Sequence, residues 1–336
     1  MNRQERHKIG ARGIDPAVRA TTARTPSGDA VAIDVVTAML GVRAAEPVVA
    51  IVSSSSEDRF PGGNFRPSEH RNLENSARAW IAAQTGAGIE RLQHLHADSI
   101  PADIGNGHVG PHTISVSYVA LVSPGQCSDR TRATWRSWYD YFPWENWRHG
   151  KPACLNHIEQ HLLAWTSQPG THCAASGADD RTRHLRIAFG TGTGWDEEKV
   201  LERYLLMHEA GLLGRESSAP AATATKSAFP LRPDHALVLA RAMGDLRRRV
   251  KYRPVVFELM QDEFTLFELQ RVVEAILGPH LHKQNFRRLV ESCGLVEPAG
   301  DIRLRTGGRP ARLYRFRRDV VLERASPGVR LRSGRV

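Results

Sequence analysis

Side chains that can hydrogen-bond the edges of nucleic-acid bases are concentrated in one short segment near the C-terminus. The segment HKQNFRRLVESCG supplies amide, guanidinium and ammonium groups from Lys283, Gln284, Asn285, Arg287 and Arg288. Amide and guanidinium groups can form paired hydrogen bonds with bases in the major groove, and cations can neutralise phosphates. We therefore interpret these five residues as candidate DNA contacts.

The surrounding sequence predicts a small α+β module that would carry these side chains on a helix. FTLFELQRVVEAILG contains a capping box at Thr265 and Glu268, apolar residues at helical spacing and a stop at Gly278-Pro279. The HKQNFRR helix follows at once, and LVEP, IRLR and RLYRFRR predict short strands around a GGRPA turn. Two short helices followed by a hairpin are typical of a winged helix-turn-helix domain.

The predicted wing adds Arg309 in its turn and Arg312 in its last strand as candidate DNA contacts. Alternation along that strand would place Tyr314 and Phe316 on one face. Leu313, Arg315 and Arg317 would lie on the opposite face. Two alternatives remain open. The arginines could simply be solvated, and winged domains also serve in protein docking.

The positive charge of the chain is concentrated in the same region. The whole chain has a net charge of +10, from 46 Lys or Arg and 36 Asp or Glu. Residues 282–336 contain 14 Lys or Arg and 5 Asp or Glu, a net charge of +9, so only +1 remains for the preceding 281 residues. This distribution favours an anionic partner for the C-terminal module.

The preceding sequence has an α/β pattern. PVVAIVSSS, TISVSYVALVS and HLRIAF predict strands, and residues 72–85 predict a helix ended by Gly86. A long helix is expected over 233–251, with an apolar stripe suited to a core or a dimer face. The aromatic segment WRSWYDYFPWENW predicts a packed apolar region, with a partner surface as the alternative.

The cysteines and the N-terminal sequence bear on the compartment. The four cysteines lie far apart without a C-x-x-C pair, which favours neither a zinc module nor a dense disulfide framework. No apolar run is long enough to span a bilayer, and MNRQERHKIGARGID has no apolar signal core. We expect a cytoplasmic protein that associates with the nucleoid and not with membranes.

The run DHALVLARAMGDLRRRVKYRPVVFEL, together with FTLFELQRVVEAILG, HKQNFRR and GGRPARLYRFRR, resembles the C-terminal part of the Nudix-related transcriptional regulators of NAD metabolism. With the Trp-rich segment and GTGTGWDEEKVLERY, the resemblance is greatest to the NadQ repressors of NAD biosynthesis. It implies an α/β Nudix-like domain, a mixed sheet flanked by helices, followed by a C-terminal α+β winged helix-turn-helix domain. One departure is His282, which stands where an acidic residue would cap the recognition helix.

The composition of the chain and this resemblance together predict five segments. They are a flexible tail (1–30), a degenerate Nudix-like effector-binding domain (31–232), a linking or dimer helix (233–251), a winged helix DNA-binding domain (252–322) and a basic tail (323–336).

The Nudix resemblance allows the hydrolase signature G-x5-E-x7-R-E-U-x-E-E-x-G-U to be checked. Gly63 and Glu69 satisfy its opening. Aligned on Gly86, however, Ala83 and Gln84 occupy the positions of the paired acids and Trp80 the position of the earlier acid. Those carboxylates would bind the divalent metals of the hydrolase. We therefore expect no metal site, no catalytic residues and no enzyme activity.

A Nudix framework without its carboxylates predicts a nucleotide sensor. The resemblance implies an adenine nucleotide, ATP or an NAD-related molecule, as the effector, with no required cofactor. The candidate effector-binding residues are Phe65 and Trp80 for stacking on a base and Arg66 and Arg78 for phosphates, although each could be purely structural.

The first hypothesis is a homodimeric repressor of NAD biosynthesis genes that binds double-stranded DNA at an inverted repeat. The alternative is an active hydrolase of a nucleoside diphosphate derivative that uses other carboxylates, such as Glu197, Glu198 or Glu202.

Overall fold

The computed structural model describes residues 23–24, 30–53, 57–100, 112–122, 133–167, 178–192, 194–213, 230–303 and 311–319. The basic tail predicted at 323–336 and most of the tail predicted at 1–30 lie outside these ranges. Within the latter, Ala23–Arg24 form strand β1, which pairs with the central strand β2. In the part of the chain that the structure describes, no helix has the length and apolar character needed to cross a membrane.

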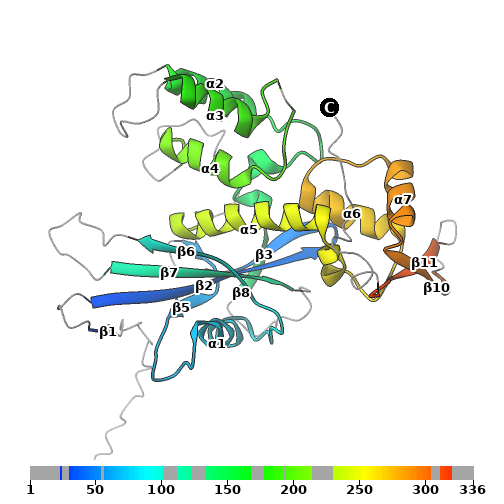
Figure 1. Cartoon of the computed structure of the whole chain (residues 1–336), viewed down its shortest axis with the longest axis horizontal. Helices are drawn as coiled ribbons and strands as arrows, with labels where there is room; N and C mark the ends of the chain where they lie inside the picture. The colour runs from blue at the N-terminus through cyan, green and yellow to red at the C-terminus, as the bar shows by residue number, and fades with distance from the viewer. Residues whose placement is uncertain are drawn as a thin grey trace, which may run out of the picture.

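A mixed sheet forms the centre of the N-terminal domain (Figure 1). Its order is β4-β3-β2-β7-β6, with β1 and β5 paired to β2 and β8 paired to β3. Strands β2 and β7 are parallel, and the other pairs are antiparallel. After β1 the strands are β2 (Ala30–Arg43), β3 (Glu46–Ser53), β4 (Asp58–Arg59), β5 (Gly62–Asn64), β6 (Gln93–Ile100), β7 (His112–Leu121) and β8 (Ala133–Ser137).

The longest strand, β2, is one of the strands that the sequence patterns miss, as are β4, β5, β6 and β8. Its Val36 and Leu40 pack on the side of the sheet that faces α5, whereas Val35 and Met39 pack on the side that faces α1. A strand that is buried on both faces shows no alternation of polar and apolar residues. The period of two that identifies a half-buried strand is therefore absent from this segment.

One face of the sheet is covered by α1 (Leu73–Thr85), a helix that the sequence predicts (Figure 1). The Asn72 side chain caps this helix by accepting a hydrogen bond from the Asn75 amide, and Gly86 ends it with a φ of 68°. Glycine adopts this left-handed conformation without steric cost.

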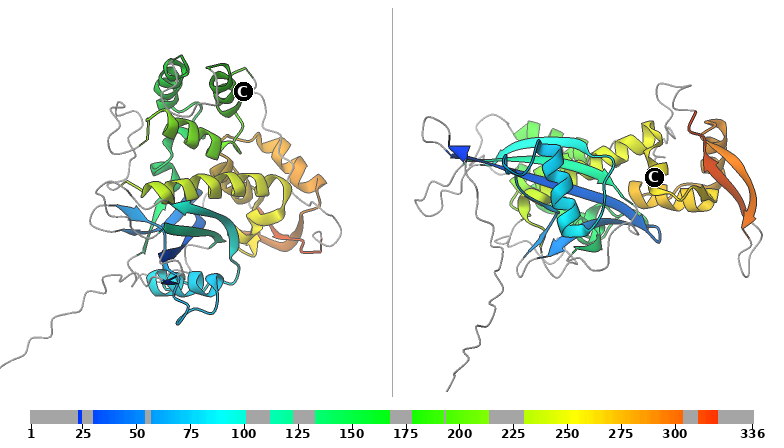
Figure 2. Two further views of the ribbon diagram at one scale, coloured as in Figure 1. Left: turned by 60° about the vertical axis from the view of Figure 1, so that its left-hand side comes forward. Right: turned by 90° about the horizontal axis from the view of Figure 1, so that it is seen from below.

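The opposite face is covered by α5 (Pro233–Tyr252), which lies between the sheet and a layer of three further helices (Figure 2). Its predicted apolar stripe is fully buried at Leu239, Met243 and Val250 and almost fully at Leu246. The stripe is therefore part of the core.

The outer layer consists of α2 (Cys154–Thr166), α3 (Ala178–Phe189) and α4 (Val200–Glu209). The strand predicted at HLRIAF is wrong, because these residues form the second half of α3. Its buried residues Leu185, Ala188 and Phe189 recur at helical spacing. A short apolar run is compatible with either element, and the helical spacing decides here.

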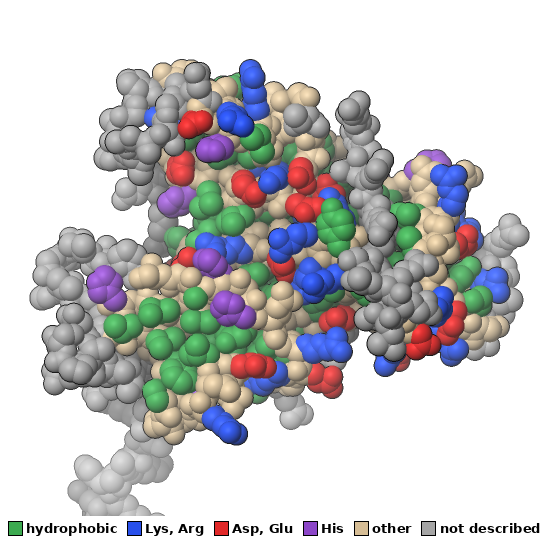
Figure 3. Space-filling model, viewed as in Figure 1, with side chains coloured by type: hydrophobic (Ala, Val, Ile, Leu, Met, Phe, Trp, Pro, Cys, Tyr) green, Lys and Arg blue, Asp and Glu red, His purple; other side chains and the backbone are tan. Residues whose placement is uncertain are grey.

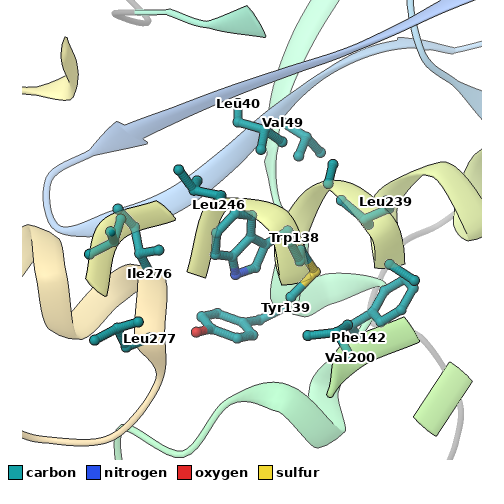
Figure 4. Packing of buried hydrophobic residues seen from close by; sticks show 14 of the residues in the cluster. Leu40, Val49, Trp138, Tyr139, Phe142, Val200, Leu239, Leu246, Ile276 and Leu277 are labelled. Carbon is teal, nitrogen blue, oxygen red and sulfur yellow. The ribbon is translucent and has the colours of Figure 1, made fainter. Parts of the chain in front are cut away.

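The aromatic segment packs inside the molecule, as predicted. It forms the turns η2 (Trp138–Asp140) and η3 (Pro143–Glu145), and Trp138 and Trp144 are almost fully buried. Figure 4 shows Trp138 and Tyr139 among core residues of the sheet, α5 and α6, with the Tyr139 hydroxyl directed toward α6.

The C-terminal module follows α5 through the turn η5 (Pro254–Leu259). It contains α6, α7 and a three-stranded sheet of order β10-β11-β9. The sequence patterns do not predict β9. The main hydrophobic cluster runs from the large sheet through α5 into this module without interruption. The elements are β9 (Glu263–Phe264), α6 (Leu266–Leu277), α7 (Lys283–Ser292), β10 (Val296–Arg303) and β11 (Ala311–Phe316).

Candidate nucleic-acid interface and nucleotide site

The two faces of α7 separate core residues from candidate DNA contacts. Phe286 and Val290 are buried against the module. The five residues on which the DNA prediction depends are all exposed: Lys283, Gln284, Asn285, Arg287 and Arg288. Figure 3 shows Lys and Arg side chains on the outer surface of this module, at the right of the view. A single helix thus offers amide, ammonium and guanidinium groups to solvent.

Helix α6 begins with the predicted capping box. The Glu268 amide donates to the Thr265 hydroxyl at 3.1 Å, and the Thr265 amide donates to the Glu268 carboxylate at 2.8 Å. Caps of this type stabilise a helix by about 1 kcal/mol. Helix α7 differs, because its N-cap residue His282 makes no side-chain capping bond.

The wing contains the predicted antiparallel hairpin. Phe316 stacks on Phe257 at 4.4 Å between ring centroids, which attaches β11 to η5. Leu313 and Tyr314, which alternation places on opposite faces of the strand, are both buried. Arg312 is exposed, whereas Arg309 lies outside the described residues.

Three of the four candidate effector residues lie together, where Trp80 in the middle of α1 meets Phe65 and Arg66 of the segment after β5. The rings of Phe65 and His70 stack at 6.1 Å, and His70 lies 6.3 Å from Trp80. The Arg66 guanidinium lies 5.5 Å from the centre of the Trp80 ring and forms an ion pair of 3.0 Å with Glu69. Aromatic rings and a guanidinium group are therefore adjacent, with the guanidinium already paired with Glu69.

Trp80 also closes tightly over β5. A Cβ atom added to Gly63 would lie 2.8 Å from the Trp80 ring, and the indole N–H donates to the Asn64 carbonyl at 3.3 Å. This glycine is therefore needed for the close approach of the indole.

Arg78 has a different role from the other three residues. Its guanidinium donates to the carbonyls of Ile89 and Glu90, and it pairs with Glu74 at 2.6 Å. These contacts attach the segment after α1 to the helix. The structure thus does not bring Arg78 to the Phe65–Trp80 cluster as a phosphate ligand.

The hydrolase signature positions are occupied by structural contacts. The Gln84 side chain accepts a hydrogen bond from the Gly62 amide and donates one to the Gly62 carbonyl, both at 2.9 Å. Ala83, the other residue at the paired acidic positions, is exposed. Among the residues that the structure describes, no group of three or more His, Cys, Asp or Glu side chains could hold a metal ion.

The carboxylates of the alternative hydrolase hypothesis are engaged in ion pairs. Glu197 and Glu198 lie in the turn before α4, and both pair with Lys251, at 2.7 and 2.8 Å. Burial opposes the charged form of Lys251, but the two carboxylates prevail and raise its pKa. Glu202 pairs with Lys199 at 3.1 Å.

A buried charged cluster centred on Glu145 of the aromatic segment is not indicated by any sequence pattern. Glu145 forms ion pairs with Arg203 and Arg247, and all three side chains have an exposed fraction of 0%. Burial raises the pKa of Glu145, but the two guanidinium groups outweigh it, so the net shift is downward. The cluster depends on residues far apart in the chain, which no local pattern reveals.

Comparison with known proteins supports the fold and identifies the C-terminal module. Residues 256–316 match a family model described as the NrtR DNA-binding winged helix domain. The ADPR responsive transcriptional repressor NtrR of Acinetobacter baylyi is 41% identical over 83 residues, which are 25% of this chain and 33% of the relative. The chain thus matches about a third of the length of this curated relative.

Solved structures extend the comparison to the N-terminal domain. Shewanella oneidensis NrtR complexed with a 27mer DNA aligns with a TM-score of 0.50 and 18% identity, covering 86% of this chain and 95% of that chain. A second structure of Shewanella oneidensis NrtR gives the same values. Likeness at this level of identity concerns the fold. The chain therefore has a Nudix-like α/β domain with a mixed sheet and flanking helices, followed by a C-terminal winged helix domain of the NrtR type.

Proposed function

We propose that this chain is a DNA-binding transcriptional repressor of NAD biosynthesis genes whose Nudix-like domain binds an adenine nucleotide without hydrolysing it. The observation that carries the proposal is the exposed set of amide and guanidinium groups on α7, within a domain that matches a DNA-binding family model. The sequence resemblance to NadQ repressors supplies the choice of target genes. Such a regulator would act in the cytoplasm, on the nucleoid.

We further propose that the protein binds an inverted repeat as a homodimer. One winged domain presents a single recognition helix, which covers only a few base pairs of the major groove. Two copies related by a two-fold axis would read two half-sites and multiply the specificity of each. In this proposal Gln284, Asn285, Arg287 and Arg288 contact base edges in the major groove, and Lys283 contacts a phosphate, as do Arg309 and Arg312 of the wing.

The proposed effector site is the cluster of Phe65, Arg66 and Trp80. The aromatic rings would stack on adenine, and the Arg66 guanidinium would pair with a phosphate. ATP, NAD and ADP-ribose all contain adenine and phosphate, and the curated relative is named as ADPR responsive. The amide of Gln84 at a position of the paired acids supports binding without hydrolysis.

Binding of a labelled promoter fragment from an NAD biosynthesis operon tests the proposal. We expect affinity that exceeds the affinity for a scrambled duplex of equal length by at least about a thousandfold and that falls steeply with salt. Titration with ATP, NAD and ADP-ribose should identify one nucleotide that changes this affinity. Equal binding of both duplexes would refute DNA recognition, and turnover of any of the nucleotides with Mg²⁺ or Mn²⁺ would refute the inactive site.

A further inference from the structure

The start of α7 is held by side chains from another helix. An α-helix leaves its first amide groups without intrahelical acceptors, and an N-cap side chain usually accepts from one of them. His282 makes no such bond. The start of α7 therefore lacks this common anchor.

Gln270 and Glu274, one turn apart on α6, provide these contacts. The Leu281 amide donates to Glu274 Oε1 at 2.9 Å, and Gln270 Nε2 donates to the Leu281 carbonyl at 2.8 Å. Gln270 Nε2 also donates to Glu274 Oε1 at 2.9 Å, which joins the two side chains. The backbone amide and carbonyl of Leu281, the residue before the N-cap, are thus both hydrogen-bonded by the Gln270–Glu274 pair.

The pair is buried, so water competes little for its hydrogen bonds. Gln270 is 7% exposed and Glu274 is 4% exposed. A buried carboxylate that lost these donors would remain desolvated without partners, which costs more free energy than an exposed hydrogen bond contributes. The second oxygen of Glu274 lies 3.3 Å from His280 Nδ1, so the carboxylate contacts the turn at two residues.

The N-terminal domain closes the other side of the same turn. Gly278 has a φ of 100°, and a Cβ atom there would lie 3.1 Å from the Glu145 carbonyl oxygen. The His149 ring meets the His280 ring edge to face at 6.5 Å. The turn between α6 and α7 therefore lies between the Gln270–Glu274 pair and the segment that follows η3.

We propose that Gln270 and Glu274 are positioning residues that set the placement of α7 for reading base edges. The proposal rests on the proposed function, because it takes α7 as the helix that enters the major groove. Neither side chain contacts the groove itself. A misplaced recognition helix loses base-edge hydrogen bonds, which require close geometry, but retains the less directional attraction between cations and phosphates.

The test uses the full chain and a labelled operator duplex, with a scrambled duplex of the same length. Glu274→Leu and Gln270→Leu should each weaken operator binding by roughly tenfold or more, since losing one base contact has an effect of about that size. Scrambled-duplex affinity and the salt dependence should stay within about twofold of the wild-type values. Glu274→Gln retains an acceptor for the Leu281 amide and should recover most of the operator affinity.

Val273→Ala is the matched control, because Val273 is fully buried on the same helix and its truncation weakens the core. It should lower thermal stability and leave the ratio of operator to scrambled affinity unchanged. The proposal is overturned if Val273→Ala lowers that ratio as much as Glu274→Leu does, or if the Leu variants lose affinity for both duplexes equally.

Amide hydrogen exchange without DNA provides an independent measurement. In Glu274→Leu, exchange should accelerate at Leu281 and in the first turn of α7, and remain slow in the middle of α6. Unchanged exchange at the start of α7 contradicts the positioning role whatever the DNA result. If the wild-type chain does not discriminate between the duplexes while exchange changes as expected, the proposed function fails and the positioning of α7 stands.

Discussion

Glu145 and Arg247 form an ion pair of 2.6 Å between Oε2 and Nη1, and neither side chain is exposed. The same carboxylate receives Arg203 of α4 at 2.7 Å, and Arg247 donates onward to the Ile276 carbonyl at the end of α6. The Glu145 carboxylate therefore joins the aromatic segment to α4 and to α5. Arg247 in turn joins α5 to the winged domain. Buried charges are tolerated only when each is paired and hydrogen-bonded, so this arrangement is specific in its geometry.

Removing the anion should destabilise the chain strongly. Glu145→Gln leaves two buried guanidinium groups without a counter-charge, so the free energy of unfolding should fall by about 3–5 kcal/mol. Urea denaturation followed by tryptophan fluorescence measures the change. The matched control is Glu159→Gln, which removes the partly exposed pair with Lys151 and should cost less than about 1 kcal/mol. Equal effects of the two variants would contradict the role of the buried cluster.

His235 predicts a dependence of stability on pH. Burial is the main cause that lowers its pKa from 6.5 to about 3, and Arg232 and Arg59 act in the same direction against Asp234. The neutral ring accepts a hydrogen bond from the Phe60 amide at 2.8 Å. Below pH 6.5 the unfolded chain binds a proton at this histidine that the folded chain does not bind. The free energy of unfolding therefore has its full value above pH 6.5 and decreases as the pH falls toward 3, with a slope of up to about 1.4 kcal/mol per pH unit.

His235→Asn tests this dependence, because the amide oxygen can replace Nδ1 as an acceptor and does not titrate. Unfolding free energies between pH 4 and pH 7 should vary less steeply in the variant, by about one proton. Parallel curves for the two proteins would show that His235 does not cause the loss.

The hairpin between β2 and β3 predicts a stabilising change. Ala44 and Ala45 have φ angles of 52° and 61°, in the left-handed region that disfavours residues with a Cβ atom. Arg43 pairs with Glu46, so the loop has two residues, for which Asn-Gly is the preferred sequence. Replacing both alanines by Asn-Gly should raise the free energy of unfolding by about 1–2 kcal/mol. Ala82→Gly, at an exposed position of α1, should instead lower it by about 1 kcal/mol.

What the sequence predicts well is local. The capping box at Thr265 and the helical spacing on either side of Gly278 identify the two helices of the winged module, because each signal lies within a few residues. Strand β2 escapes prediction because burial on both faces removes its periodicity, and α3 is mistaken for a strand because HLRIAF is short. Among the effector candidates, Arg78 is separated from the cluster by its contacts with Ile89 and Glu90, which no local pattern reveals. The Glu145 cluster depends entirely on such distant partners.

The proposed recognition helix α7 should give two distinguishable DNA phenotypes. Arg287→Ala should cost about 1–3 kcal/mol of operator binding and relax the base preference at one position, since a guanidinium reads a base edge. Lys283→Ala should weaken operator and scrambled duplexes alike and reduce the salt slope by about one. Fluorescence anisotropy over a salt series measures both. Arg248→Ala on α5 removes another exposed charge outside the module, and a comparable loss of operator affinity there would contradict the assignment to α7.

The aromatic part and the cationic part of the proposed nucleotide site can be tested separately. Trp80→Leu removes the ring on which adenine would stack, so nucleotide affinity measured by calorimetry should fall by about tenfold. Arg66→Ala should produce a similar loss by removing the adjacent cation. Arg78→Ala should leave nucleotide affinity within about twofold and instead accelerate amide exchange around Ile89 and Glu90, whose carbonyls it binds. A loss of affinity in Arg78→Ala, with Trp80→Leu unaffected, would move the effector site away from the Phe65–Trp80 cluster.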